Sequence, residues 1–136
     1  LLIWGMLSKQ QAIKKVALVG FIIAGLTVIA AVQSGERAED IVESMPGVSE
    51  QVIHEHEEAA ELAQWLTIIL GVGAIGGLFL LSGKLKYAKQ IMVVLLLYSL
   101  IVGGMLVYTA NLGGKIMHPE LSNTTAVQSL DQDRDD

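Results

Sequence analysis

The residues best suited to chemistry form one short cluster, His54-Glu55-His56-Glu57-Glu58, with Glu61 one helical turn further on. Imidazole nitrogens and carboxylate oxygens bind metal ions, and an imidazole nitrogen is also an axial ligand of haem iron. The spacing differs from the zinc motif H-E-x-x-H, because position 58 is glutamate. On a helix, His54, Glu58 and Glu61 share one face, whereas His56 lies about 160° around the axis from His54. The two histidines are therefore not expected to serve one site.

Two interpretations of this cluster stay open. In the first, one histidine is an axial ligand of haem b or a ligand of a metal ion, and a carboxylate such as Glu58 orients its ring. In the second, the segment is a solvated, charge-rich helix face whose histidines are incidental. The third histidine of the chain, His118, follows the last apolar run. The candidate haem ligands are thus His54, His56 and His118, and the candidate metal ligands are His54, His56, Glu58 and His118.

The elements that must position these residues are three apolar runs, 16–32, 65–81 and 91–108, which carry no charged residue. With its flanks, each run reaches the roughly twenty residues that cross about 30 Å of hydrocarbon as a helix. No run alternates with period two, and backbone groups in lipid must be satisfied internally, so helices are predicted rather than barrel strands. Residues 1–7 are predicted to be the end of a further transmembrane helix. The predicted fold class is an all-α, polytopic transmembrane bundle of three complete helices plus the end of a fourth at the N-terminus.

The bundle is predicted to occupy residues 1–120, followed by an acidic, disordered tail over 121–136. Gln33-Ser34-Gly35 is typical of a helix end, and residues 36–43 form either a surface turn or a continuation of the helix before them.

Two further helix boundaries are predicted from capping residues. Ser49 is expected to cap a long helix that runs to Leu81. Asn111-Leu112-Gly113-Gly114 is expected to end the last helix.

The charged residues predict an orientation in the membrane. Six of the nine basic residues lie in the short connections 8–15 and 82–90, and all fourteen acidic residues lie in 33–64 or in the polar segment from about Asn111 onward. By the positive-inside rule, the short connections are cytoplasmic. We therefore expect a multi-pass protein of the bacterial inner membrane, with residues 33–64 and the C-terminus in the periplasm. The six residues are Lys9, Lys14, Lys15, Lys84, Lys86 and Lys89.

Small residues in the apolar runs predict close helix packing. Residues 71–76 match the dinucleotide pattern G-x-G-x-x-G, but they lie inside an apolar run without the strand and helix N-terminus that this motif needs. Gly73 and Gly77 instead form a G-x-x-x-G pair, and Ser99 and Gly103 form a weaker pair of the same kind. The alternative is chance, because glycine is common in transmembrane helices.

Several classes of protein are disfavoured. The chain has no cysteine, which excludes thiolate ligation, iron–sulfur clusters and covalent c-type haem. The apolar runs hold no ionisable residue, although transporters use such residues near the midplane. No nucleophile–base pair stands out, so an enzyme is the least favoured class.

The order of these features resembles a bacterial membrane family known as domain of unknown function 2231. Two elements carry the resemblance, which spans about residues 1–120: the charged segment His54-Glu55-His56-Glu57-Glu58 before the family's third helix, and Asn111-Leu112-Gly113-Gly114-Lys115-Ile116-Met117-His118 at the end of its fourth. The family's first-helix histidine motif has no counterpart here. The resemblance implies a four-helix membrane domain in a haem-linked or electron-transfer setting, and no enzyme activity.

Two functions from different classes are predicted. One is a small membrane electron-transfer component, a b-type haem-binding subunit of a respiratory or other redox complex, with a periplasmic redox protein as partner. The other is a non-catalytic accessory or structural subunit of a larger membrane complex. Both place the chain in a lipid bilayer beside other membrane subunits or further copies of itself, and neither involves nucleic acid.

Overall fold

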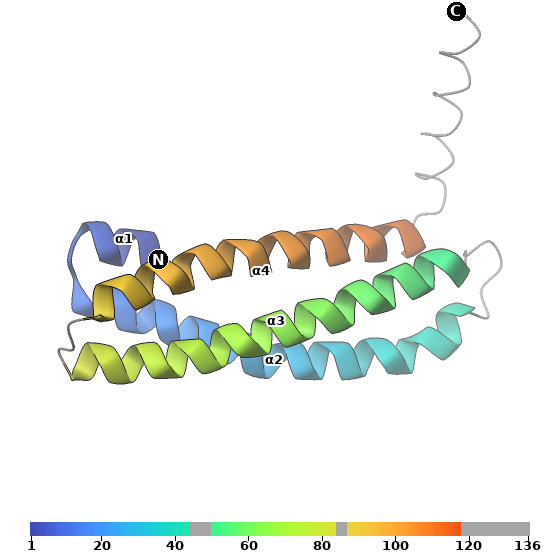
Figure 1. Cartoon of the computed structure of the whole chain (residues 1–136). Helices are drawn as coiled ribbons and strands as arrows, with labels where there is room; N and C mark the ends of the chain where they lie inside the picture. Colours follow the sequence, from blue (N-terminus) through green and yellow to red (C-terminus); the bar gives the residue numbers. More distant parts are fainter. Residues whose placement is uncertain (44–49, 84–86, 118–136) are drawn as a thin grey trace, which may run out of the picture.

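The computed structural model of the chain describes residues 1–43, 50–83 and 87–117 (Figure 1). All regular structure in these ranges is α-helical, and α2, α3 and α4 are each long and apolar enough to cross a membrane. The predicted fold class, an all-α transmembrane bundle, is thereby confirmed. The helices are α1 (Leu2–Leu7), α2 (Gln11–Glu43), α3 (Glu50–Ser82) and α4 (Ala88–Met117).

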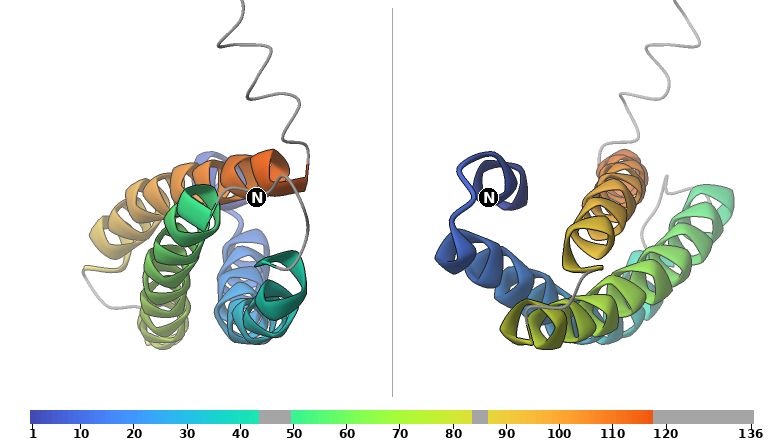
Figure 2. Two further views of the ribbon diagram at one scale, coloured as in Figure 1. Left: turned by 90° about the vertical axis from the view of Figure 1, so that its right-hand side faces the viewer. Right: turned by 60° about the vertical axis from the view of Figure 1, so that its left-hand side comes forward.

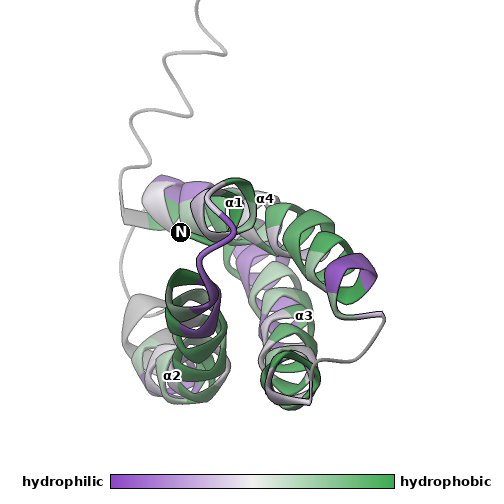
Figure 3. Ribbon diagram, turned by 90° about the vertical axis from the view of Figure 1, so that its left-hand side faces the viewer, coloured by the Kyte–Doolittle hydropathy of each residue, from purple (hydrophilic) through white to green (hydrophobic). Residues whose placement is uncertain are grey.

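The three long helices are predominantly apolar (Figure 3). Large side chains stand exposed there: Ile23 is 54% exposed, Phe79 75% and Ile101 62%. In water such a continuous apolar surface would drive association, whereas in a bilayer it contacts lipid tails. The chain is therefore a multi-pass membrane protein.

Helix α3 is the central element of the bundle. It packs against both α2 and α4 (Figure 2), whereas the backbones of α2 and α4 do not approach each other closely within the described residues. The short helix α1 contacts α2 and α4, and the chain turns from α1 into α2 through Lys9, whose φ is +57°. The buried core of this bundle includes Leu2, Leu18, Leu70 and Met92, one from each helix. The prediction that residues 1–7 end a longer transmembrane helix stays a prediction.

Of the two alternatives for residues 36–43, the structure shows the continuation: helix α2 runs through Gly35 to Glu43. The helix end predicted at Asn111-Leu112-Gly113-Gly114 is wrong, because α4 continues through Gly114 to Met117. A glycine ends a helix when it takes a positive φ, and neither glycine does so here. Helix α3 begins at Glu50, as predicted, although the capping residue Ser49 lies outside the described residues, as does the C-terminal tail from residue 118.

The two ends of the bundle carry opposite charge. One end, called the basic end below, holds Lys9, Lys14, Lys15 and Lys89, while Lys84 and Lys86 lie outside the described residues. The other, called the acidic end, holds the first three turns of α3, with Glu50, Glu55, Glu57, Glu58 and Glu61. The two described histidines, His54 and His56, lie at the acidic end, and His118 lies outside the described residues.

Candidate functional site

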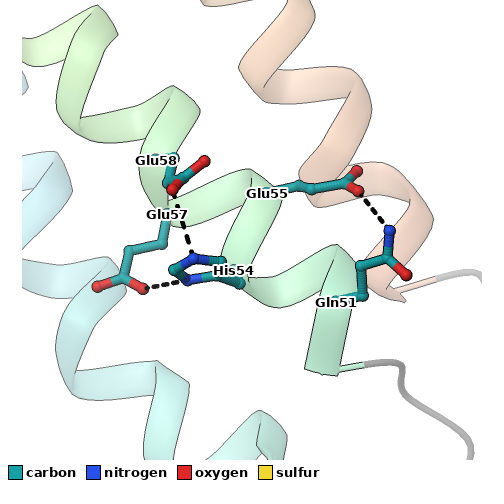
Figure 4. Close-up of polar contacts among 5 residues, drawn as sticks. All are labelled: Gln51, His54, Glu55, Glu57 and Glu58. Atoms are coloured by element: carbon teal, nitrogen blue, oxygen red, sulfur yellow. Dashed lines mark hydrogen bonds and ion pairs between the residues drawn. The ribbon is translucent and has the colours of Figure 1, made fainter.

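His54 lies on the solvent side of α3 at the acidic end. Its Nδ1 is 3.7 Å from a carboxylate oxygen of Glu57, and its Nε2 is 3.4 Å from a carboxylate oxygen of Glu58 (Figure 4). The side chain of His54 is 70% exposed, and the two glutamates are 55% and 72% exposed. Water screens charges this exposed, so these contacts hold the ring only weakly.

His56 lies on the opposite side of α3 and points toward α4. Its Nδ1 is 3.0 Å from the backbone carbonyl oxygen of Thr109, a residue of α4, and the contact is partly buried. A carbonyl oxygen only accepts hydrogen bonds, so Nδ1 carries the hydrogen and donates it. In the neutral ring, Nε2 then has the lone pair. Within the described part of the chain, no hydrogen bond engages Nε2.

Thr109 ties α4 to α3 through its side chain as well. Its Oγ1 lies 3.1 Å from the carbonyl oxygen of Ala59 on α3 and 3.0 Å from that of Met105 on its own helix. A hydroxyl has one hydrogen to donate, so it serves one of these carbonyls at a time. The contact of this hydroxyl with Ala59 fixes the position of Thr109 along α3. It therefore also fixes the backbone carbonyl of Thr109, which accepts the hydrogen bond from His56.

The remaining predicted ligands are not brought together with His56. Glu58 contacts His54 on the other side of α3, and His118 lies outside the described residues. Among the described side chains, no group of three or more histidine, aspartate or glutamate residues is placed to hold a metal ion. The described residues therefore provide a single oriented imidazole. An imidazole nitrogen is a common ligand of haem iron.

The predicted packing residues separate into two groups. A Cβ built on Gly73 would lie 3.0 Å from Leu95, and one built on Gly77 would lie 3.0 Å from Met92, so both glycines face α4. On α4, the Ser99 hydroxyl donates to the carbonyl of Leu96 in its own helix. Gly103 has no described atom within 4 Å of a built Cβ, so the packing predicted there is not made within the described chain.

Two structural features went unpredicted. The first is the crossing of α2 and α3 at Gly25 and Gly71, where the two backbones approach closely. The second is the set of residues around His56, namely Thr109 and Gly113. The sequence held a signal for Thr109, the first polar residue after the apolar run that ends at Tyr108.

Comparison of the chain with protein-family models, with curated proteins and with solved structures finds no match. The resemblance to the four-helix family therefore stays a prediction.

Proposed function

We propose that this protein is a membrane electron-transfer component that holds a b-type haem through Nε2 of His56. The observation that carries the proposal is the hydrogen bond from Nδ1 of His56 to the carbonyl oxygen of Thr109. Histidines that ligate metals commonly donate their second ring N–H to a backbone carbonyl, which fixes both the tautomer and the ring orientation. A bound haem would supply one-electron oxidation and reduction of its iron, and the chain would supply the axial nitrogen.

The residues present fit this group better than they fit a metal ion. A haem needs few protein ligands, whereas a structural or catalytic metal site takes three or four. One oriented imidazole is available, and the cysteine-free sequence leaves non-covalent b-type binding as the open route. His118, which lies outside the described residues, or a histidine of a partner chain would supply a second nitrogen ligand.

His56 is favoured over His54 by its surroundings. The ring of His56 is half-buried between α3 and α4, and its Nδ1 is held by a backbone carbonyl. The ring of His54 is exposed and lies among carboxylates. The solvated-surface interpretation of the histidine cluster thus suits His54 and not His56.

The alternative function, an accessory subunit of a larger membrane complex, has one observation in its favour. Within the described residues the backbones of α2 and α4 stay apart, and each of these helices keeps an apolar flank open to neighbouring helices. Gly103 on α4 belongs to this open surface. An accessory role requires no cofactor, so haem binding separates the two proposals.

The ligand assignment is tested by titrating haemin into the purified full-length chain. We expect the wild type and His54→Ala to bind haemin with equal affinity, and His56→Ala to lose at least about 10-fold in affinity, because the oriented nitrogen is gone. The two variants remove the same side chain two positions apart on one helix, so His54→Ala controls for the loss of a ring. Equal affinity of all three proteins would contradict the assignment.

We further propose that the acidic end faces the periplasm of a bacterium, where a soluble redox protein would approach it. The lysines of the basic end support this orientation. Because residues 1–136 include no cysteine, Glu50→Cys and Lys89→Cys each introduce a single labelling site into this chain. An impermeant thiol reagent should label Glu50→Cys in intact spheroplasts and reach Lys89→Cys only after permeabilisation. The reverse pattern would show that the proposed orientation is inverted.

A further inference from the structure

We infer that Gly113 is a positioning residue for His56. Because glycine has no side chain, it leaves room for the imidazole ring against α4. This inference rests on the proposed function only in giving the His56 ring the role of a haem ligand. The packing itself is a property of the chain with or without a bound group.

The contact geometry carries the inference. A Cβ built on Gly113 would lie 3.2 Å from Cε1 of His56, 3.6 Å from Nδ1 and 3.8 Å from Nε2. All three close atoms belong to the one ring, so the ring occupies the space beside this glycine. A Cβ at 3.2 Å is tighter than nine in ten real Cβ contacts, and the ring would have to give way by a few tenths of an ångström.

Gly113 and Thr109 act on the ring from adjacent turns of α4. They are four residues apart, so they lie on the same face of the helix. Thr109 provides the carbonyl that accepts from Nδ1, and Gly113 provides the space in which the ring reaches that carbonyl. Gly113, which lies in the segment predicted from its glycines to be a helix end, is thus part of the His56 surroundings.

The neighbouring Gly114 supplies a matched control. It is also helical, it is exposed, and no atom of the described residues lies within 4 Å of a Cβ built on it. Valine or alanine at either position changes helix propensity in the same way, so background effects on the helix cancel between the two.

The experiment measures the ¹⁵N shifts of the imidazole nitrogens in the haem-free full-length protein, at a pH where the rings are neutral. With three histidines in the sequence, single His→Ala variants assign every signal. We expect the wild type, Gly114→Ala and Gly114→Val to keep His56 protonated on Nδ1. Gly113→Val should lose this form, and Gly113→Ala should show a smaller shift in the same direction.

Haemin affinity is then measured on the same proteins. We expect Gly113→Val to bind about 10- to 100-fold more weakly than Gly114→Val, the loss found when partners of a ligating histidine are removed. Unchanged His56 shifts in both Gly113 variants, or equal changes in the Gly114 variants, would overturn the inference. A wild type that keeps the Nδ1-protonated ring but binds no haemin would instead overturn the proposed function, and leave the packing role of Gly113 standing.

Discussion

Replacing Gly71 with leucine is expected to cause the largest loss of stability of any single change in the apolar part of this bundle. A Cβ at Gly71 would lie 3.3 Å from the carbonyl oxygen of Phe21 and 3.4 Å from Cα of Gly25. Both neighbours are backbone atoms of α2, which cannot rotate away as a side chain can. The leucine would therefore force α2 and α3 apart along their whole crossing.

The expected cost is about 3 kcal/mol of unfolding free energy or more, the upper end of what overpacked cores lose. Reversible unfolding in detergent or bilayers measures it. Gly76→Leu is the control, since Gly76 lies on the same helix, is exposed and has nothing within 4 Å of a built Cβ. That variant should be neutral or gain up to about 1 kcal/mol from helix propensity. A Gly71→Leu protein as stable as Gly76→Leu would show that α2 and α3 do not cross at this glycine.

Gly77→Leu is expected to have the second largest effect. A Cβ there would meet Met92 at 3.0 Å, Leu95 at 3.1 Å and Leu18 at 3.3 Å. These neighbours are side-chain ends rather than backbone, and the thioether of Met92 adapts readily. Gly77→Ala should therefore be tolerated within about 1 kcal/mol, whereas the larger leucine should cost about 2 kcal/mol. A graded loss from alanine to leucine supports packing of Gly77 against α4, and a flat response would place Gly77 against lipid.

The elements of the fold were predictable because their cause is local. An uncharged apolar run of sufficient length must become a helix in lipid, wherever its neighbours lie. The helix ends were less predictable. Gly35 and Gly114 are compatible with a helix end and with a helix interior, and the choice depends on whether the chain needs to turn there.

The sequence did not predict which faces of the helices point into the bundle. In a membrane the lipid side is as apolar as the core, so hydrophobic periodicity does not separate them. Ile69 and Leu70 illustrate this: they are adjacent and both aliphatic, yet Ile69 is 55% exposed and Leu70 is 3% exposed. The Gly25–Gly71 crossing was missed for the same reason.

Of the candidate site, the sequence predicted that His54 and His56 face opposite ways, because two residues span more than half a helical turn. It did not predict which of them faces α4. That choice depends on the register between α3 and α4, which is set by contacts such as Gly73 against Leu95 far from the histidines in sequence. The partners of His56, Thr109 and Gly113, follow from the same register.

The measurement that tests the central claim most directly is the reduced-minus-oxidised difference spectrum of the full-length protein as purified from membranes. The wild type and His54→Ala are expected to show the Soret and α bands of a b-type haem that is reversibly reduced. His56→Ala is expected to lack them, because Nε2 of His56 is the proposed axial nitrogen. A wild type without these bands, or a His56→Ala spectrum identical to the wild type, would contradict the account.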